Sequence, residues 1–127
     1  LGDVYKRQIY GVTTYYTPSG TSAVVLLPNA ASSGKVFKIN QIVVSNTTGS
    51  AVNATVSIYT NGAVAQGSAP SGGTAYPIVS VVSVPAYSSL IAVDKSTSFY
   101  LQEGTSISIT SGTGSALTYS VSYEDIS

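Results

Sequence analysis

The stretch Leu117-Thr-Tyr-Ser-Val-Ser-Tyr123 alternates strictly between large apolar or aromatic residues and small hydroxyl residues. A period of two places every large side chain on one face of an extended chain, so this stretch predicts a strand with one buried face. Ile107 and Ile109 alternate with hydroxyl residues in the same way, and the turn residues 111–115 separate the two stretches. Together they predict an antiparallel β-hairpin.

Similar short runs occupy the rest of the chain. Strand candidates lie at 11–17, 23–27, 36–45, 54–59, 78–84, 90–93 and 99–101, with turn residues between them and no helix-length segment. Within 36–45 the apolar parity changes between Ile39 and Ile42, which predicts a β-bulge near Asn40-Gln41 or a strand buried on both faces. The spacing of the runs predicts an all-β fold, namely a single antiparallel β-sandwich, jelly-roll-like, of about eight strands.

Composition supports one β domain and excludes several kinds of chemistry. The 127 residues suffice for one domain, and Val, Ile and Thr supply 39 of them. The chain has no Cys and no His, which removes disulfides, thiolate nucleophiles, Cys-based metal sites and the commonest general base. Five basic residues balance five acidic ones, which argues against binding nucleic acid through its phosphates. The longest apolar run, 23–27, is too short to span a membrane.

The first eight residues differ from the rest of the chain. They hold three of the ten charged residues, and the composition changes abruptly after them. We therefore expect residues 1–8 to be a non-native or disordered N-terminal segment, and residues 9–127 to be a single β-sandwich domain.

Candidates for catalysis are few. Asp94 and Glu103 fall in predicted turns and could approach each other as a carboxylate pair, and Glu124 and Asp125 complete the acidic residues of the domain. The spacing of these groups does not match a calcium-binding loop, and turn formation explains them better. A serine hydrolase without histidine would need a Ser–Lys pair. Serines do lie near Lys35, Lys38 and Lys95, but serine is so common in this chain that their proximity is expected by chance. We therefore predict no enzymatic activity, no catalytic, cofactor-binding or metal-binding residue, and no cofactor.

Three other features could serve binding or modification. Asn46-Thr-Thr48 and Asn53-Ala-Thr55 fit the acceptor pattern for N-glycosylation, which is also expected by chance in so Thr-rich a chain. Tyr15-Tyr16, Tyr76 and Tyr87 could form an aromatic platform for a sugar or a protein, or could simply cover the rims of the sandwich. Residues 61–75 form a long loop of small residues, and we expect this loop to be an arm that contacts a neighbouring subunit.

Two segments carry a resemblance to a known group of proteins. Residues 84–107 include Tyr-Leu-Gln-Glu-Gly-Thr-Ser-Ile at 100–107, and residues 116–126 end in Ser-Tyr-Glu-Asp-Ile. With the strand Lys-Val-Phe-Lys-Ile-Asn-Gln-Ile-Val-Val-Ser-Asn at 35–46, this pattern resembles small β-rich virion structural proteins of tailed phages known from marine and other environmental sequence. The resemblance covers roughly residues 35–126, and its motifs are strands and turns rather than chemistry. It implies a role in head decoration, the neck or the tail.

The expected function follows from the resemblance and from the surface composition. We expect a virion structural protein, such as a capsid decoration or cement protein or a head–tail accessory protein, located in the extracellular particle. The alternative is a carbohydrate- or receptor-binding β-module of a tail fibre or of a cell-surface filament. A β surface with so few charges is poorly protected against association, so we expect a homo-oligomer, with a trimer favoured, or binding to other virion proteins. We expect no nucleic-acid or membrane partner.

The hydrophobic core is also predicted from the alternation. We expect one set of side chains to be buried together, namely Phe37, Ile39, Val56, Ile58, Val82, Leu90, Phe99, Leu101, Ile107, Ile109, Leu117 and Val121.

Overall fold

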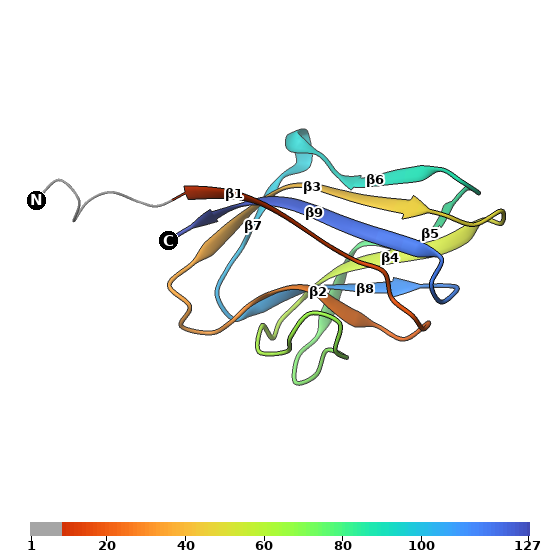
Figure 1. The fold of residues 1–127 in the computed structure, drawn as a ribbon. Coiled ribbons are helices and arrows are strands. Elements are labelled where there is room, and N and C mark those ends of the chain that lie inside the picture. The colour runs from red at the N-terminus through yellow and green to blue at the C-terminus, as the bar shows by residue number, and fades with distance from the viewer. Residues whose placement is uncertain (1–8) are drawn as a thin grey trace, which may run out of the picture.

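The computed structural model describes residues 9–127, which form two antiparallel sheets packed face to face (Figure 1). The sheet of five strands has the order β1-β9-β3-β6, with β7 also pairing with β3, and the sheet of four strands has the order β2-β8-β4-β5. This arrangement confirms the predicted antiparallel β-sandwich. The segment expected to be non-native or disordered, 1–8, lies outside the described residues. The strands are β1 (Ile9–Tyr16), β2 (Val24–Asn29), β3 (Val36–Asn46), β4 (Val52–Tyr59), β5 (Ala75–Val84), β6 (Ser89–Val93), β7 (Phe99–Leu101), β8 (Thr105–Ser111) and β9 (Leu117–Ile126).

The chain repeatedly crosses from one sheet to the other. Among the strands of the described residues, only β4–β5 and β6–β7 are consecutive within one sheet. Strands β6 and β7 lie end to end along β3, because β6 pairs with residues 42–45 and β7 pairs with residues 37–39. The short 3₁₀ turn η2 (Lys95–Thr97) interrupts them. Within residues 9–127 no helix is long and apolar enough to cross a membrane.

The change of parity in β3 has the predicted cause. The register of β3 against β9 shifts between Ile39 and Gln41, so one extra residue bulges out of the strand. The bulge lets Ile39 and Ile42 both face the interior, where each is fully buried. The predicted β-bulge is therefore confirmed, and the alternative of a strand buried on both faces is wrong, because Gln41 is exposed.

Most of the predicted core is buried between the two sheets. Ile58, Leu90 and Phe99 are only partly buried but pack against the core. The prediction was wrong for Val82, which opposes Ala54 on the edge strand β5 and stays half-buried outside the cluster. An edge strand has a neighbour on one side only, so fewer atoms cover its side chains. The fully confirmed members are Phe37, Ile39, Val56, Leu101, Ile107, Ile109, Leu117 and Val121.

Tyr119 belongs to the core although its hydroxyl is polar. The side chain is fully buried, and the hydroxyl donates to the carbonyl oxygen of Thr110 at 2.8 Å. The hydroxyl also lies 3.1 Å from Oγ of Ser111. Burial raises the pKa of Tyr119, which keeps the hydroxyl protonated as a donor. A buried tyrosine thus connects the ends of β8 and β9 without leaving an unpaired polar atom.

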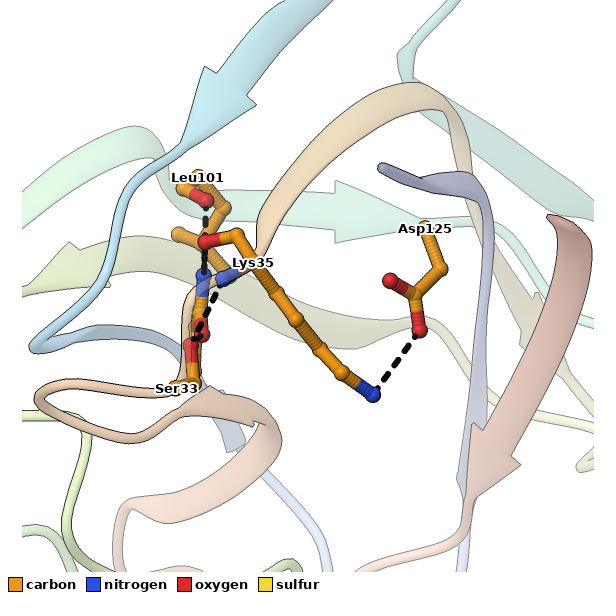
Figure 2. A network of polar contacts seen from close by, with 5 residues as sticks. Ser33, Lys35, Leu101 and Asp125 are labelled. Carbon is orange, nitrogen blue, oxygen red and sulfur yellow. Dashed lines mark hydrogen bonds and ion pairs between the residues drawn. The ribbon is translucent and has the colours of Figure 1, made fainter. Parts of the chain in front are cut away.

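Asn29 connects the two sheets at one end of the sandwich. Its side chain is buried, and Nδ2 donates to the carbonyl oxygens of Lys35 and Leu101, each at 3.0 Å. Oδ1 accepts from the hydroxyl of Ser33 at 2.6 Å, and that hydroxyl in turn accepts from the backbone N–H of Lys35. Figure 2 shows this network beside the ion pair of Lys35 and Asp125. Asn29 thereby joins the end of β2 to the start of β3 and the end of β7.

Asn46 does the same at the other end of β3. Its Nδ2 donates to the carbonyl oxygens of Ser50 at 2.8 Å and Val84 at 3.0 Å. Its Oδ1 accepts from the backbone N–H of Thr48 at 2.9 Å and from the Thr48 hydroxyl at 2.7 Å. The bond to Val84 joins β3 of one sheet to β5 of the other.

The fully buried Leu117 provides a test of the core. Leu117→Ala should lower the free energy of unfolding by about 2–5 kcal/mol, because the surrounding side chains cannot close the cavity. Leu90→Ala is the control, since Leu90 is half-buried on an edge strand and its truncation should cost less. Urea unfolding followed by circular dichroism measures both; equal losses would contradict the described packing.

The Asn29 network makes a second prediction. Asn29→Ala leaves the carbonyl oxygens of Lys35 and Leu101 and the Ser33 hydroxyl without this partner, and each buried unpaired group costs about 1–3 kcal/mol. Asn53→Ala is the matched control, because Asn53 is exposed on β4. The same unfolding measurement should show a large loss of stability for the first variant and almost none for the second. A stable Asn29→Ala variant would show that the amide does not hold the sheets together.

Candidate interaction surface

The acidic side chains considered for catalysis are used in separate local contacts. The Asp94 carboxylate caps η2, accepting from the backbone N–H groups of Ser96 at 3.0 Å and Thr97 at 3.2 Å. The Glu103 carboxylate accepts from the backbone N–H of Gly34 at 2.8 Å. Each carboxylate therefore accepts hydrogen bonds from a different loop, as the turn interpretation predicted.

The other acidic groups of residues 9–127 form ion pairs between β9 and the residues at or just before the start of β3. Asp125 Oδ2 lies 3.3 Å from Nζ of Lys35, and Glu124 Oε2 lies 3.8 Å from Nζ of Lys38. Neither lysine is hydrogen-bonded through Nζ to a serine among the contacts of residues 9–127. Across that same part of the chain, no group of three or more acidic side chains is placed to hold a metal ion, and no pocket is present.

The two glycosylation motifs differ in access. Asn46 is buried, and both of its amide hydrogens are donated to backbone carbonyls, so this side chain cannot accept a glycan in the folded protein. The Asn46 side chain instead joins β3 to β5 through its hydrogen bond to the carbonyl oxygen of Val84. Asn53 is exposed on β4, and its motif remains accessible.

The tyrosines proposed as an aromatic platform do not come together. Tyr76 opposes Ile58 near the start of β5, whereas Tyr87 follows the end of that strand and its backbone N–H donates to the carbonyl of Thr48. The length of β5, ten residues, separates them. Tyr15 points outward from the five-stranded sheet, on the opposite side of β1 from Tyr16. The interpretation as a single platform is therefore wrong, because these tyrosines belong to different surfaces.

The loop 61–75 lies against its own domain. We call it the strap. The backbone N–H of Gly67 donates to the carbonyl of Val25 at 2.8 Å, and the backbone N–H of Val25 donates to the carbonyl of Ser68 at 2.9 Å, so the strap extends the edge of β2. The strap also accepts from Oγ of Ser106 and donates to the hydroxyl of Tyr59.

These contacts place the strap over the outer face of the four-stranded sheet. Beneath the strap, the outward-facing side chains of Tyr59, Ser57, Ser106 and Ser108 are each less than one tenth exposed. Asn53, farther along β4, stays exposed. Gly62 is required where the strap begins, because a Cβ there would collide with the carbonyl oxygens of Asn29 and Thr105. These hydrogen bonds hold the loop against its own domain. A contact of this loop with a neighbouring subunit stays a prediction.

The outer face of the five-stranded sheet is left uncovered by residues 9–127. Four of the eight exposed large hydrophobic side chains lie on it, and they are Ile9, Tyr15, Ile91 and Tyr100. Its only charged side chains among the described residues are Lys38 and Glu124, which oppose each other across β3 and β9. We call this surface the outer β face.

The hydroxyl groups on the outer β face are paired with one another across strands. Oγ1 of Thr13 lies 3.1 Å from Oγ of Ser122, and Oγ1 of Thr17 lies 2.7 Å from Oγ1 of Thr118. Oγ of Ser45 lies 3.3 Å from Oγ of Ser89. A hydroxyl that already has a partner loses less when water is removed from it. The outer β face can therefore be buried at small cost.

No protein-family model and no curated protein matches the sequence. Among solved structures, the chain is similar to the structure of the infectious bursal disease virus Gt strain, with 10% identity, a TM-score of 0.41, and coverage of 96% of this chain and 32% of that chain. It is similar to the T13 viral particle of that virus with 9% identity, a TM-score of 0.34 and coverage of 94% and 31%. It is similar to the VP2 subviral particle with 13% identity, a TM-score of 0.32 and coverage of 96% and 32%. The chain spans about a third of the length of these chains.

The capped turn between β6 and β7 gives a prediction about pH. Hydrogen bonds from Ser96 and Thr97 hold the pKa of Asp94 below its usual value of 3.8. The cap therefore stabilises the fold above the unfolded pKa and is lost as the pH falls through the lower folded value. Asp94→Asn should lose less stability on acidification than the unmodified domain, measured by urea unfolding between neutral pH and pH ~2. Identical acid profiles would show that the cap does not contribute.

Proposed function

We propose that this domain is a jelly-roll subunit of a virion, acting through contacts between subunits as a capsid decoration or cement protein or as a head–tail accessory protein. The strand order supports the jelly-roll assignment. If β6 and β7 are counted as one interrupted strand, the two sheets read 1-8-3-6 and 2-7-4-5, the interleaved order of a double Greek key. Viral capsid proteins and lectins both use this architecture, so the surface has to decide between them.

The observation that carries the proposal is the outer β face. It is uncovered, it holds four exposed large hydrophobic residues, and its one cation and one anion are paired with each other. A free monomer would be poorly protected against association through such a face. A subunit that is covered by its neighbours needs no such protection, which is why a role in an assembly fits this surface best.

A glycan-binding module has less support from the same geometry. Sugar sites in β-sandwiches gather aromatic side chains and polar groups in one place. Here Tyr76 and Tyr87 lie at opposite ends of β5, and Tyr15 lies on the outer β face. Location in the extracellular particle and the absence of enzymatic activity are part of the proposal.

The proposal predicts self-association of residues 9–127. Static light scattering across a range of concentrations should give a mass above that of the monomer, with discrete, regular assemblies in electron micrographs. Ser120→Lys places a cation in the middle of the outer β face and should weaken association at least about tenfold, a change of about 1.4 kcal/mol. Asn53→Lys, at an exposed position of the other sheet, is the matched control and should leave association unchanged.

Two results would contradict the proposal. One is a domain that stays monomeric at all concentrations, and the other is amorphous aggregation that neither substitution alters. The same scattering measurement tests the trimer expected from the surface composition, because a trimer would have three times the mass of the monomer.

A further inference from the structure

We propose that the outer β face binds the same face of a second copy of this chain. The two copies are related by a two-fold axis that lies in the plane between the two faces. This axis runs parallel to the strands, above the line midway between β3 and β9. This inference rests on the proposed function, because it names the partner of the surface that the proposed function uses. Its basis is the arrangement of side chains in two rows, each of which crosses four of the five strands of the sheet.

The first row contains the charged pair. Gly11 of β1 opposes Glu124 of β9, Glu124 opposes Lys38 of β3, and Lys38 opposes Tyr100 of β7. Rotation about this axis keeps the position of each row along the strands and reverses the order of its residues. Each row of one copy therefore lies over the same row of the other copy, end to end. The rotation places Glu124 opposite Lys38 of the second copy, and Lys38 opposite Glu124 of the second copy. The charges on the face are complementary to themselves under this rotation.

The ends of the first row are also complementary in size. A Cβ built on Gly11 would meet no atom of residues 9–127 within 4 Å, so this part of the chain leaves an open position there. Tyr100, at the other end of the row, is 60% exposed. The same rotation places the Tyr100 ring of one copy over Gly11 of the other. An aromatic side chain that fills such an opening is a typical anchor of a protein interface.

The second row follows the same rule. Tyr15 opposes Ser120, Ser120 opposes Val43, and Val43 opposes Ile91. The rotation places Tyr15 opposite Ile91 of the second copy and Ser120 opposite Val43 of the second copy. The large exposed side chains at the two edges of the sheet are thereby covered by each other. In the middle of the row, the small Ser120 faces the medium-sized Val43. No charged residue in either row is left without an opposite charge.

The contact is isologous, because each copy uses the same patch. It gives a dimer, or an assembly with an even number of copies, in place of the trimer expected from the sequence. An isologous contact by itself cannot close three copies into a ring.

Charge reversal tests the arrangement directly. Lys38→Glu puts two acidic side chains on each outer β face, and Glu124→Lys puts two basic side chains there. Each variant alone should associate at least about tenfold more weakly than the unmodified domain, because like charges would then meet across the axis. An equimolar mixture of the two variants should associate again, as a heterodimer in which every charge faces its opposite. Both variants should fold, because the Lys38–Glu124 pair is an exposed ion pair and contributes little to stability.

The control is Lys95→Glu, which makes the charge change of Lys38→Glu in the exposed η2 turn, outside the two rows of side chains. It should associate as the unmodified domain does. Sedimentation velocity of each variant and of the mixture reads out the masses, and circular dichroism verifies folding. A second variant, Gly11→Trp, fills the opening that receives Tyr100 and should weaken association without affecting the fold.

The outcomes separate this inference from the proposed function. If the unmodified domain associates and both charge reversals leave its mass unchanged, the two-fold contact is wrong while self-association stands, and another surface or another virion protein covers the outer β face. If the charge reversals disrupt association but the mixture does not restore it, the face is used without this axis, and the inference is again wrong. If the unmodified domain stays monomeric, self-association and the inference both fail.

Discussion

The sandwich depends on two buried asparagines, Asn29 and Asn46, whose side chains join its sheets at the two ends of β3. Each amide donates both of its hydrogens to backbone carbonyls and accepts from a hydroxyl close by. A strand that ends inside a packed structure leaves backbone groups unpaired, and these cost free energy unless a side chain or water satisfies them. Asparagine offers a donor and an acceptor on a short stem, so it can fill such a position where a carboxylate would bring a charge.

The position of the strap determines which surface is left for a partner. The strap crosses the outer face of the four-stranded sheet and extends the edge of β2. Part of that outer face is then covered within the chain itself. The outer β face receives no such cover from residues 9–127, although it carries exposed aromatic and aliphatic side chains. The asymmetry between the two faces is a property of this fold and supports the assignment of one of them to a partner.

Local patterns in the sequence predicted the features that local geometry controls. The alternation at 117–123 predicted β9, and the parity change between Ile39 and Ile42 predicted the bulge in β3. Features that depend on residues distant in sequence could not be predicted in this way. Asn46 fits a glycosylation motif, and only the approach of Val84, 38 positions away, gives it a structural role. The loop 61–75 has a flexible composition, but the backbone of β2 provides partners that hold it. Val82 has the right parity for the core, and its place on an edge strand keeps it half-buried.

The near absence of charge has a physical meaning for how such a face can bind. Burying an isolated charge costs several kcal/mol, so charged surfaces usually stay in water. Cross-strand pairing of Thr13 with Ser122, and of Ser45 with Ser89, means that these hydroxyls keep a partner when water leaves. In the proposed dimer, the weak exposed contact between Lys38 and Glu124 in each copy would be exchanged for a contact with the other copy. That contact is shielded from water, where attraction between opposite charges is stronger. The face therefore combines a small desolvation cost with one polar requirement, and that requirement favours a partner that presents the same two charges in the opposite order.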